Sequence, residues 1–265
     1  MEFNYKWVNV LVLVYFALPL WANAEIYFVA TDGNNDNPGT MAQPFASIQQ
    51  AQNHVAPGDT VYIRGGIYTM TESLIALKEK IWARVILLDK SGLPNKRINY
   101  WAYLNEQPIF DFSKVKPEGY RVNAFDVPGS WIHLKGIEVI GVQFTINTHT
   151  QSICFTNNGS HNIYEQLSIH DGQAIGIYSL RGSHNFFLNC DVYNNHDYTF
   201  EEGKVGNVDG FGCHAGKDDV GNIFRGCRAW FNSDDGYDCI NSAESVVFEN
   251  CWAFYNGYSK EFEGL

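Results

Sequence analysis

The sequence predicts an all-β chain that folds as a parallel β-helix, a solenoid of stacked coils, with a capping helix at its N-terminal end. The phrase DGFGC at residues 209–213 recurs as DGYDC at residues 235–239, 26 positions later. Cysteines recur at a matching interval, since Cys227 and Cys251 lie 24 residues apart. A repeat of this length is typical of one solenoid coil, in which like residues stack on like.

Residues 1–24 have the pattern of a secretory signal peptide. Lys6 precedes an apolar run from Trp7 to Trp21, and the segment ends in the A-x-A sequence at residues 22–24. The run is short for a transmembrane anchor and ends in a cleavage site. We therefore expect a secreted protein, extracellular or periplasmic, with no membrane attachment after cleavage. Residues 25–265 are predicted to form one β-helix domain.

The charge balance restricts the partners. The formal net charge is −11, which argues against nucleic acid as a ligand. An acidic substrate would need a bridging cation to bind such a chain. We expect the protein to act as a monomer.

The N-terminal segment contains the predicted cap. A strand is expected over Glu25–Ala30 and another over Thr60–Arg64. Between them, apolar residues at helical spacing predict a helix near Pro44–His54. Such a helix would cover the open end of the first coil.

The next segment shows less regularity. Strands are expected over Ile98–Tyr103 and Pro108–Phe112, whereas Leu74–Leu88 is interpreted as a loop excursion. From Asn123 onward each repeat shows two strand patterns separated by Gly, Ser or Asn turns.

One apolar column runs through these repeats at intervals of 30, 23, 37 and 24 residues: Ile137, Leu167, Cys190, Cys227 and Cys251. Side chains in such a column point the same way, so the cysteines are predicted to be buried free thiols rather than disulfides. An asparagine follows each cysteine by five residues, and stacked asparagines form hydrogen-bonded ladders. The predicted ladder consists of Asn195, Asn232 and Asn256.

Four aspartates gather around the repeated phrase. Stacking places Asp209 over Asp235, with Asp234 and Asp238 beside them, and oxygen ligands of this kind suit Ca²⁺. Asp235 and Asp238 would face opposite sides of a straight strand. For both to bind one ion, the chain must turn at Gly236, or Asp235 must reach in from the turn before the strand. Solvated turn aspartates are the alternative. The insertion at residues 195–207 is expected to wall this patch.

The stretch at residues 208–238 resembles the calcium-site core of polysaccharide lyase family 9, which contains pectate lyases and related rhamnogalacturonan lyases. The entry segment at residues 44–68 is similar to that of secreted right-handed parallel β-helix proteins. This resemblance implies a right-handed β-helix that cleaves pectin-type polyuronates, acidic plant cell-wall polysaccharides, by β-elimination. It also implies that the four aspartates hold the calcium and that a lysine beyond Leu265 is the base, so we expect the domain to be incomplete at its C-terminal end.

Other residues near the patch are candidates for gripping substrate carboxylates. They are His196, Lys204, His214, Lys217 and Tyr237. Lys217 is also the in-chain alternative for the base. The catalytic base itself stays unassigned.

Two other functions remain open at this stage. A β-helical hydrolase of the polygalacturonase type also uses clustered aspartates, without a metal. A non-catalytic solenoid that binds acidic glycans through calcium is the second, because the expected lysine is missing from residues 1–265. The sequence does not separate homogalacturonan from rhamnogalacturonan, or endo from exo cleavage.

Overall fold

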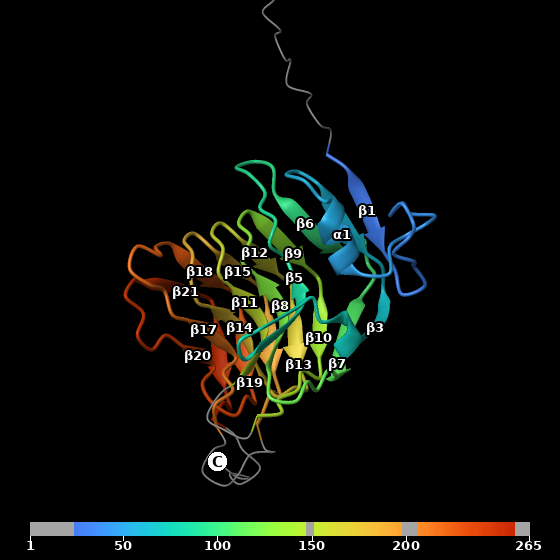
Figure 1. Cartoon of the computed structure of the whole chain (residues 1–265). Helices are drawn as coiled ribbons and strands as arrows, with labels where there is room; N and C mark the ends of the chain where they lie inside the picture. The colour runs from blue at the N-terminus through green and yellow to red at the C-terminus, as the bar shows by residue number, and fades with distance from the viewer. Residues whose placement is uncertain (1–23, 147–150, 198–205, 258–265) are drawn as a thin grey trace, which may run out of the picture.

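The structure, a computed structural model, describes residues 24–146, 151–197 and 206–257. Apart from Ala24, the predicted signal peptide lies outside these residues, as does Lys204. The described chain winds as a right-handed β-helix from β1 at the blue end of Figure 1 to β20 and β21 at the red end. No helix in the described part is long and apolar enough to cross a membrane.

Three sheets form the walls of the solenoid, so a full coil contributes three strands rather than the two expected from the repeat. The first sheet, here sheet A, contains β1 (Ile26–Val29), β2 (Thr60–Ile63), β6 (Ile98–Ala102), β9 (Ile132–Lys135), β12 (Ile163–Glu165), β15 (Phe186–Leu188), β18 (Asn222–Arg225) and β21 (Val246–Glu249). Sheet B contains β3 (Gly66–Thr71), β7 (Pro108–Lys114), β10 (Glu138–Ile140), β13 (Ser168–His170), β16 (Asp191–Tyr193), β19 (Arg228–Trp230) and β22 (Trp252–Phe254).

Sheet C carries the repeated Asp-Gly phrase and consists of β4 (Leu77–Glu79), β5 (Trp82–Leu87), β8 (Arg121–Val127), β11 (Ser152–Asn157), β14 (Ala174–Ser179), β17 (Phe211–Cys213) and β20 (Tyr237–Asp238). Its neighbours pair in parallel, except that β4 and β5 form an antiparallel hairpin. The interpretation of Leu74–Leu88 as a loop was therefore wrong. Alternate residues of β5, Ala83 and Val85, are fully buried, although nothing in this segment repeats the later coils.

The predicted cap is α1 (Ile48–His54), which lies against the first coils in Figure 1. It begins later than expected because Ser47 is its N-cap: the Ser47 hydroxyl accepts a hydrogen bond from the Gln50 amide at 3.2 Å. Ile48 and Ala51 are buried against the coils. A short 3-10 helix, η1 (Glu72–Leu74), follows β3.

The core consists of stacked columns. Ile137, Leu167, Cys190 and Cys227 are buried in one column, with Cys251 packed against it, as predicted. All six cysteines are described, and all are free thiols. Aromatic rings stack in a second column, with Tyr164, Phe187, Phe224 and Phe248 at centroid separations of 5.0, 4.2 and 5.1 Å. Equivalent positions of successive coils stack in parallel, which explains why one column holds small and aliphatic apolar side chains and the other holds aromatic rings.

The asparagine ladder is confirmed. The Asn195 amide donates to the Asn232 side-chain oxygen at 3.2 Å, and Asn232 donates to that of Asn256 at 3.0 Å. A second ladder, not predicted, runs through Asn162, Asn185 and Asn222 at another turn. These buried amides satisfy the backbone groups of the turns, which keeps the coils in register.

Candidate metal centre

Sheet C bends at the repeated phrase, and the bend places Asp235 and Asp238 on the same outer face. A Cβ added at Gly236 would come within 2.8 Å of Ala253 Cβ, so this glycine faces the interior. The next residue, Tyr237, also faces inward, because its ring stacks on Phe211 with 5.1 Å between the centroids. Two successive inward residues shift the alternation, and the turn that calcium binding would require at Gly236 is present.

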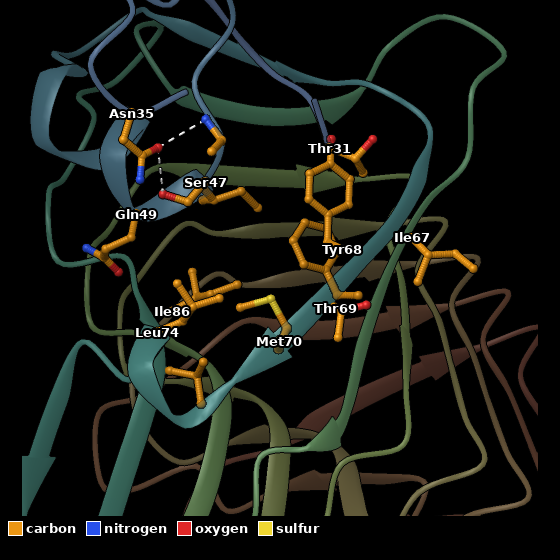
Figure 2. A pocket seen from close by; sticks show the side chains of 14 residues that line it. Thr31, Asn35, Ser47, Gln49, Ile67, Tyr68, Thr69, Met70, Leu74 and Ile86 are labelled. Atoms are coloured by element: carbon orange, nitrogen blue, oxygen red, sulfur yellow. Dashed lines mark hydrogen bonds between the residues drawn. The ribbon is translucent and has the colours of Figure 1, made fainter. Parts of the chain in front are cut away.

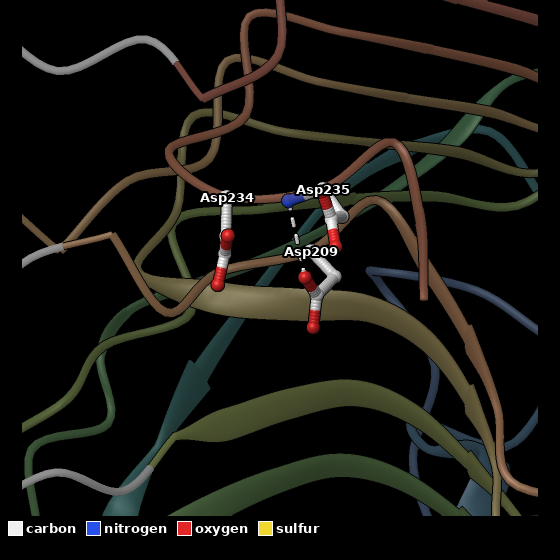
Figure 3. A group of neighbouring side chains, drawn as sticks. All are labelled: Asp209, Asp234 and Asp235. Carbon is white, nitrogen blue, oxygen red and sulfur yellow. Dashed lines mark hydrogen bonds between the residues drawn. The ribbon is translucent and has the colours of Figure 1, made fainter. Parts of the chain in front are cut away.

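Three aspartates meet at this bend. Carboxylate oxygens of Asp209, Asp234 and Asp235 lie within 4.8 Å of one another. Figure 3 shows the three side chains side by side. Asp209 is buried, Asp234 half-buried and Asp235 exposed. The Asp235 amide donates to Asp209 Oδ1 at 3.2 Å, and the Gly210 amide donates to the Asp235 carbonyl at 2.8 Å, which holds the two coils together.

The electrostatics of the cluster disfavour its full ionisation. Burial, followed by repulsion from Asp234 and Asp238, raises the pKa of Asp209 to about 8. The backbone hydrogen bond from Asp235 opposes this rise. A site of carboxylates that repel one another gains stability from a bound cation, and an all-oxygen donor set fits Ca²⁺, which takes about six to eight oxygen ligands.

Asp238 lies outside this group of three. Its Oδ2 is 3.0 Å from His214 Nε2, and its Oδ1 accepts from the Ile240 amide at 2.7 Å. His214 Nδ1 is in turn 3.0 Å from the Tyr178 hydroxyl. The Tyr178 ring has room because its neighbour in the next strand is Gly212, where a Cβ would come within 2.2 Å of the ring. Asp238 still acts on the cluster, since it contributes to the raised pKa of Asp209.

The other predicted site residues have different surroundings. Tyr237 is half-buried and packs against the interior, where its hydroxyl donates to the Cys227 carbonyl at 2.7 Å. Lys217 is exposed in the turn after β17. His196 is half-buried, and its amide donates to the Gly172 carbonyl at 2.9 Å. Among the substrate-contact candidates, His214 is joined to one of the four aspartates, Asp238, by a hydrogen bond.

Asp197 is a site-forming residue that the sequence analysis did not single out. This buried carboxylate accepts from the amides of Gly206 and Asn207 at 2.9 and 3.1 Å, and from the Ser233 hydroxyl at 2.7 Å. It therefore ties both ends of the 195–207 insertion to the turn that carries Asp234. The insertion itself falls largely outside the described residues.

A separate cavity of about 400 Å³ lies near the N-terminal end, between α1, β3 and β5 (Figure 2). Its lining includes Ile67, Met70 and Leu74. Tyr68 is its one described lining residue with a titratable side chain, and its hydroxyl donates to the Arg64 carbonyl at 2.8 Å. This cavity has no charged group for catalysis and is not part of the aspartate site.

The fold and the site together are those of a right-handed parallel β-helix protein with a carboxylate cluster on one sheet, and comparison with known proteins identifies the family. Residues 27–264 match the family described as "Pel9A-like, right handed beta helix region", and the chain belongs to that family. It is homologous to pectate lyases of polysaccharide lyase family 9.

Individual relatives agree. Pectate lyase L of Dickeya dadantii (strain 3937) is 35% identical over 88% of this chain and 51% of that protein. Pectate lyase PEL9 of Emericella nidulans is 31% identical over 91% and 60%. The chain thus spans about half the length of these curated relatives.

Solved structures give the same result. A protein titled "Rhamnogalacturonan lyase" superposes with a TM-score of 0.85 and 46% identity, over 89% of this chain and 58% of that one. Pectate lyase Pel9A superposes with a TM-score of 0.72 and 32% identity, over 92% and 57%.

Proposed function

We propose that this chain belongs to a secreted, calcium-dependent lyase that cleaves pectin-type polyuronates by β-elimination. The observation that carries the proposal is the aspartate cluster at the bend of sheet C, in a chain homologous to pectate lyases. Asp209, Asp234 and Asp235 would supply most of the protein ligands. Asp238, which faces the same side, would join them or remain with His214. We propose that the protein acts as a monomer and is not attached to a membrane once the signal peptide has been cleaved.

The reaction removes the C5 proton of a uronate and breaks the C4–O bond, which leaves an unsaturated uronate. Calcium bound to the adjoining carboxylate would act as a Lewis acid and disperse the charge that develops as this proton leaves. The aspartates would hold the site negative, with Asp209 on one coil and Asp234 and Asp235 on the next. The relatives' names divide between pectate and rhamnogalacturonan, so both polymers are proposed substrates.

The base is proposed to come from a lysine of a later coil in a longer protein. Lys217 is exposed in the turn after β17 and forms no ion pair among the described residues, and Lys204 lies outside them. A positioned base is typically worth about 10²–10⁴-fold in rate. The 265-residue chain is therefore expected to bind polyuronate with calcium and to cleave it slowly.

The test is to incubate the chain with polygalacturonate and with rhamnogalacturonan, with and without chelator, and to follow ultraviolet absorbance of unsaturated ends. Calcium-dependent unsaturated product supports the lyase. New reducing ends without absorbance would indicate a hydrolase, and calcium-dependent binding without any product would indicate a binding solenoid. A form extended through further coils should release product faster than the 265-residue chain.

A further inference from the structure

Arg121 stands at the start of β8, on the sheet that carries the aspartate cluster. Its guanidinium carbon lies 4.0 Å from the centroid of the Trp82 ring, on the neighbouring strand. Its Nε donates to the Gln151 carbonyl, and its Nη2 lies 3.4 Å from Gln151 Oε1. These contacts hold the side chain flat along the sheet and direct it toward β11, one coil closer to the aspartates.

Arg121 has no counter-ion in the described part of the chain. Within the described residues, no carboxylate lies within 4.0 Å of Arg121, whereas Arg64 pairs with Glu106 and Arg228 with Asp191. Burial of the unpaired guanidinium lowers the pKa of Arg121 to about 10. Its Nη1 makes no hydrogen bond with the described residues and retains contact with solvent. A half-buried cation without a carboxylate partner gains most from an incoming anion.

The position of Arg121 connects it to the metal centre. Strand β8 lies three strands before β17 in sheet C, and parallel strands are ~4.8 Å apart, so the guanidinium, directed one strand forward, lies roughly 10 Å from the coil of Asp209. Strand β14, which lies between β11 and β17, carries Tyr178. Its pKa is raised to about 12 by burial and by Asp238 and Asp209, while Arg121 acts in the opposite direction. The Tyr178 hydroxyl then meets His214, which contacts Asp238.

We propose that Arg121 forms a subsite for the carboxylate of a second uronate, in a polymer whose other uronate lies at the aspartate cluster. The inference rests on the proposed function. A uronate has one carboxylate, so carboxylates at two places two coils apart must belong to different sugars of one chain. The planar guanidinium offers paired N–H donors that match a carboxylate, and Nη1 is free to make the first of these bonds.

Arg97 provides a matched control. It also stacks over a tryptophan, Trp131 at 5.0 Å, and donates to a backbone carbonyl, that of His161. Burial lowers its pKa as well. However, Arg97 immediately precedes β6 of sheet A, on a different wall of the solenoid from the aspartates. A substitution there removes the same stacking and the same kind of hydrogen bond without touching the proposed subsite.

The experiment measures the affinity of tetragalacturonate by calorimetry in saturating calcium, for the wild-type chain and for Arg121→Gln, Arg121→Lys and Arg97→Gln. Calcium affinity and melting temperature are measured on each. The loss of a charge-assisted pair to carboxylate should weaken tetragalacturonate binding about tenfold or more in Arg121→Gln. Arg121→Lys keeps the positive charge but lacks the paired N–H donors of the guanidinium, so it should weaken tetragalacturonate binding less than Arg121→Gln does. Arg97→Gln should bind as the wild type does, and calcium affinity should be equal in all four.

The contrary outcomes separate the two proposals. Wild-type affinity in Arg121→Gln refutes the subsite and leaves the lyase proposal standing. If calcium affinity falls in Arg121→Gln by the same factor as tetragalacturonate affinity, the subsite is also refuted, because Arg121 would then support the metal centre. Absence of calcium-dependent tetragalacturonate binding in the wild type refutes both. If Arg121→Gln does not fold, Arg121→Lys decides the question, since it retains the aliphatic stem and the charge.

Discussion

His214 Nε2 lies 3.0 Å from Asp238 Oδ2, and this contact joins the fourth predicted aspartate to a neighbouring coil rather than to the other three. The other ring nitrogen, His214 Nδ1, lies 3.0 Å from the Tyr178 hydroxyl. The two contacts together fix the orientation of the ring. His214 holds the Asp238 carboxylate in place beside the cluster.

Replacing His214 by alanine should weaken calcium binding by about ten- to a hundredfold, because partners that orient ligating carboxylates typically contribute that much to metal affinity. Titration calorimetry with calcium measures the effect. His184→Ala is the control, since this exposed histidine stacks on His161 in a ladder at another turn. Equal calcium affinity in His214→Ala and the wild type would show that Asp238 needs no such support.

Asp235→Asn should weaken calcium binding more strongly, because it removes one full charge from the cluster of three. Asp218→Asn is the matched control, as Asp218 is an exposed turn residue whose amide, not its carboxylate, bonds to Glu244. Both variants are compared with the wild type by calorimetry. A calcium isotherm unchanged by Asp235→Asn would mean that the cluster consists of ordinary turn aspartates.

The metal-free protein should lose stability as the pH rises from about 4 to about 8. The pKa of Asp209 is raised to about 8 in the folded chain, so between these values the folded state binds a proton that the unfolded state has released. The loss is on the order of 5 kcal/mol as an upper limit, since each pKa step is worth ~1.4 kcal/mol.

Urea unfolding in chelator at several pH values measures this dependence. Asp209→Asn should flatten it across that range, and saturating calcium should reverse it by favouring the ionised cluster. A slope that persists in Asp209→Asn would assign the effect to other groups.

Asn232→Ala should destabilise the fold by about 2–4 kcal/mol, because it leaves buried polar groups without partners. The Asn232 side chain is fully buried, donates to the Val192 carbonyl at 3.1 Å and to Asn256 at 3.0 Å, and accepts from Asn195. Thermal and urea unfolding measure the loss. Asn53→Ala, on the exposed face of α1, should change stability by less than about 1 kcal/mol. Comparable losses in the two variants would contradict the ladder's role.

The sequence alone predicted the solenoid, the column from Ile137 to Cys251, the ladder from Asn195 to Asn256 and the four aspartates. These features repeat along the chain at the length of a coil. Because coils stack in parallel, an interval in the sequence becomes a vertical contact in the structure, and a periodic pattern can be converted directly into neighbours.

The tertiary structure decided what does not repeat. The strand alternation of the sequence put Asp235 and Asp238 on opposite faces, and only the packing of Gly236 and Tyr237 into the interior brings them to one side. The contact of His214 with Asp238 and that of Arg121 with Gln151 span 24 and 30 residues, so each joins neighbouring coils. These residues do not repeat from coil to coil, and which side chain each one meets is decided only by the direction of the side chains in the packed structure.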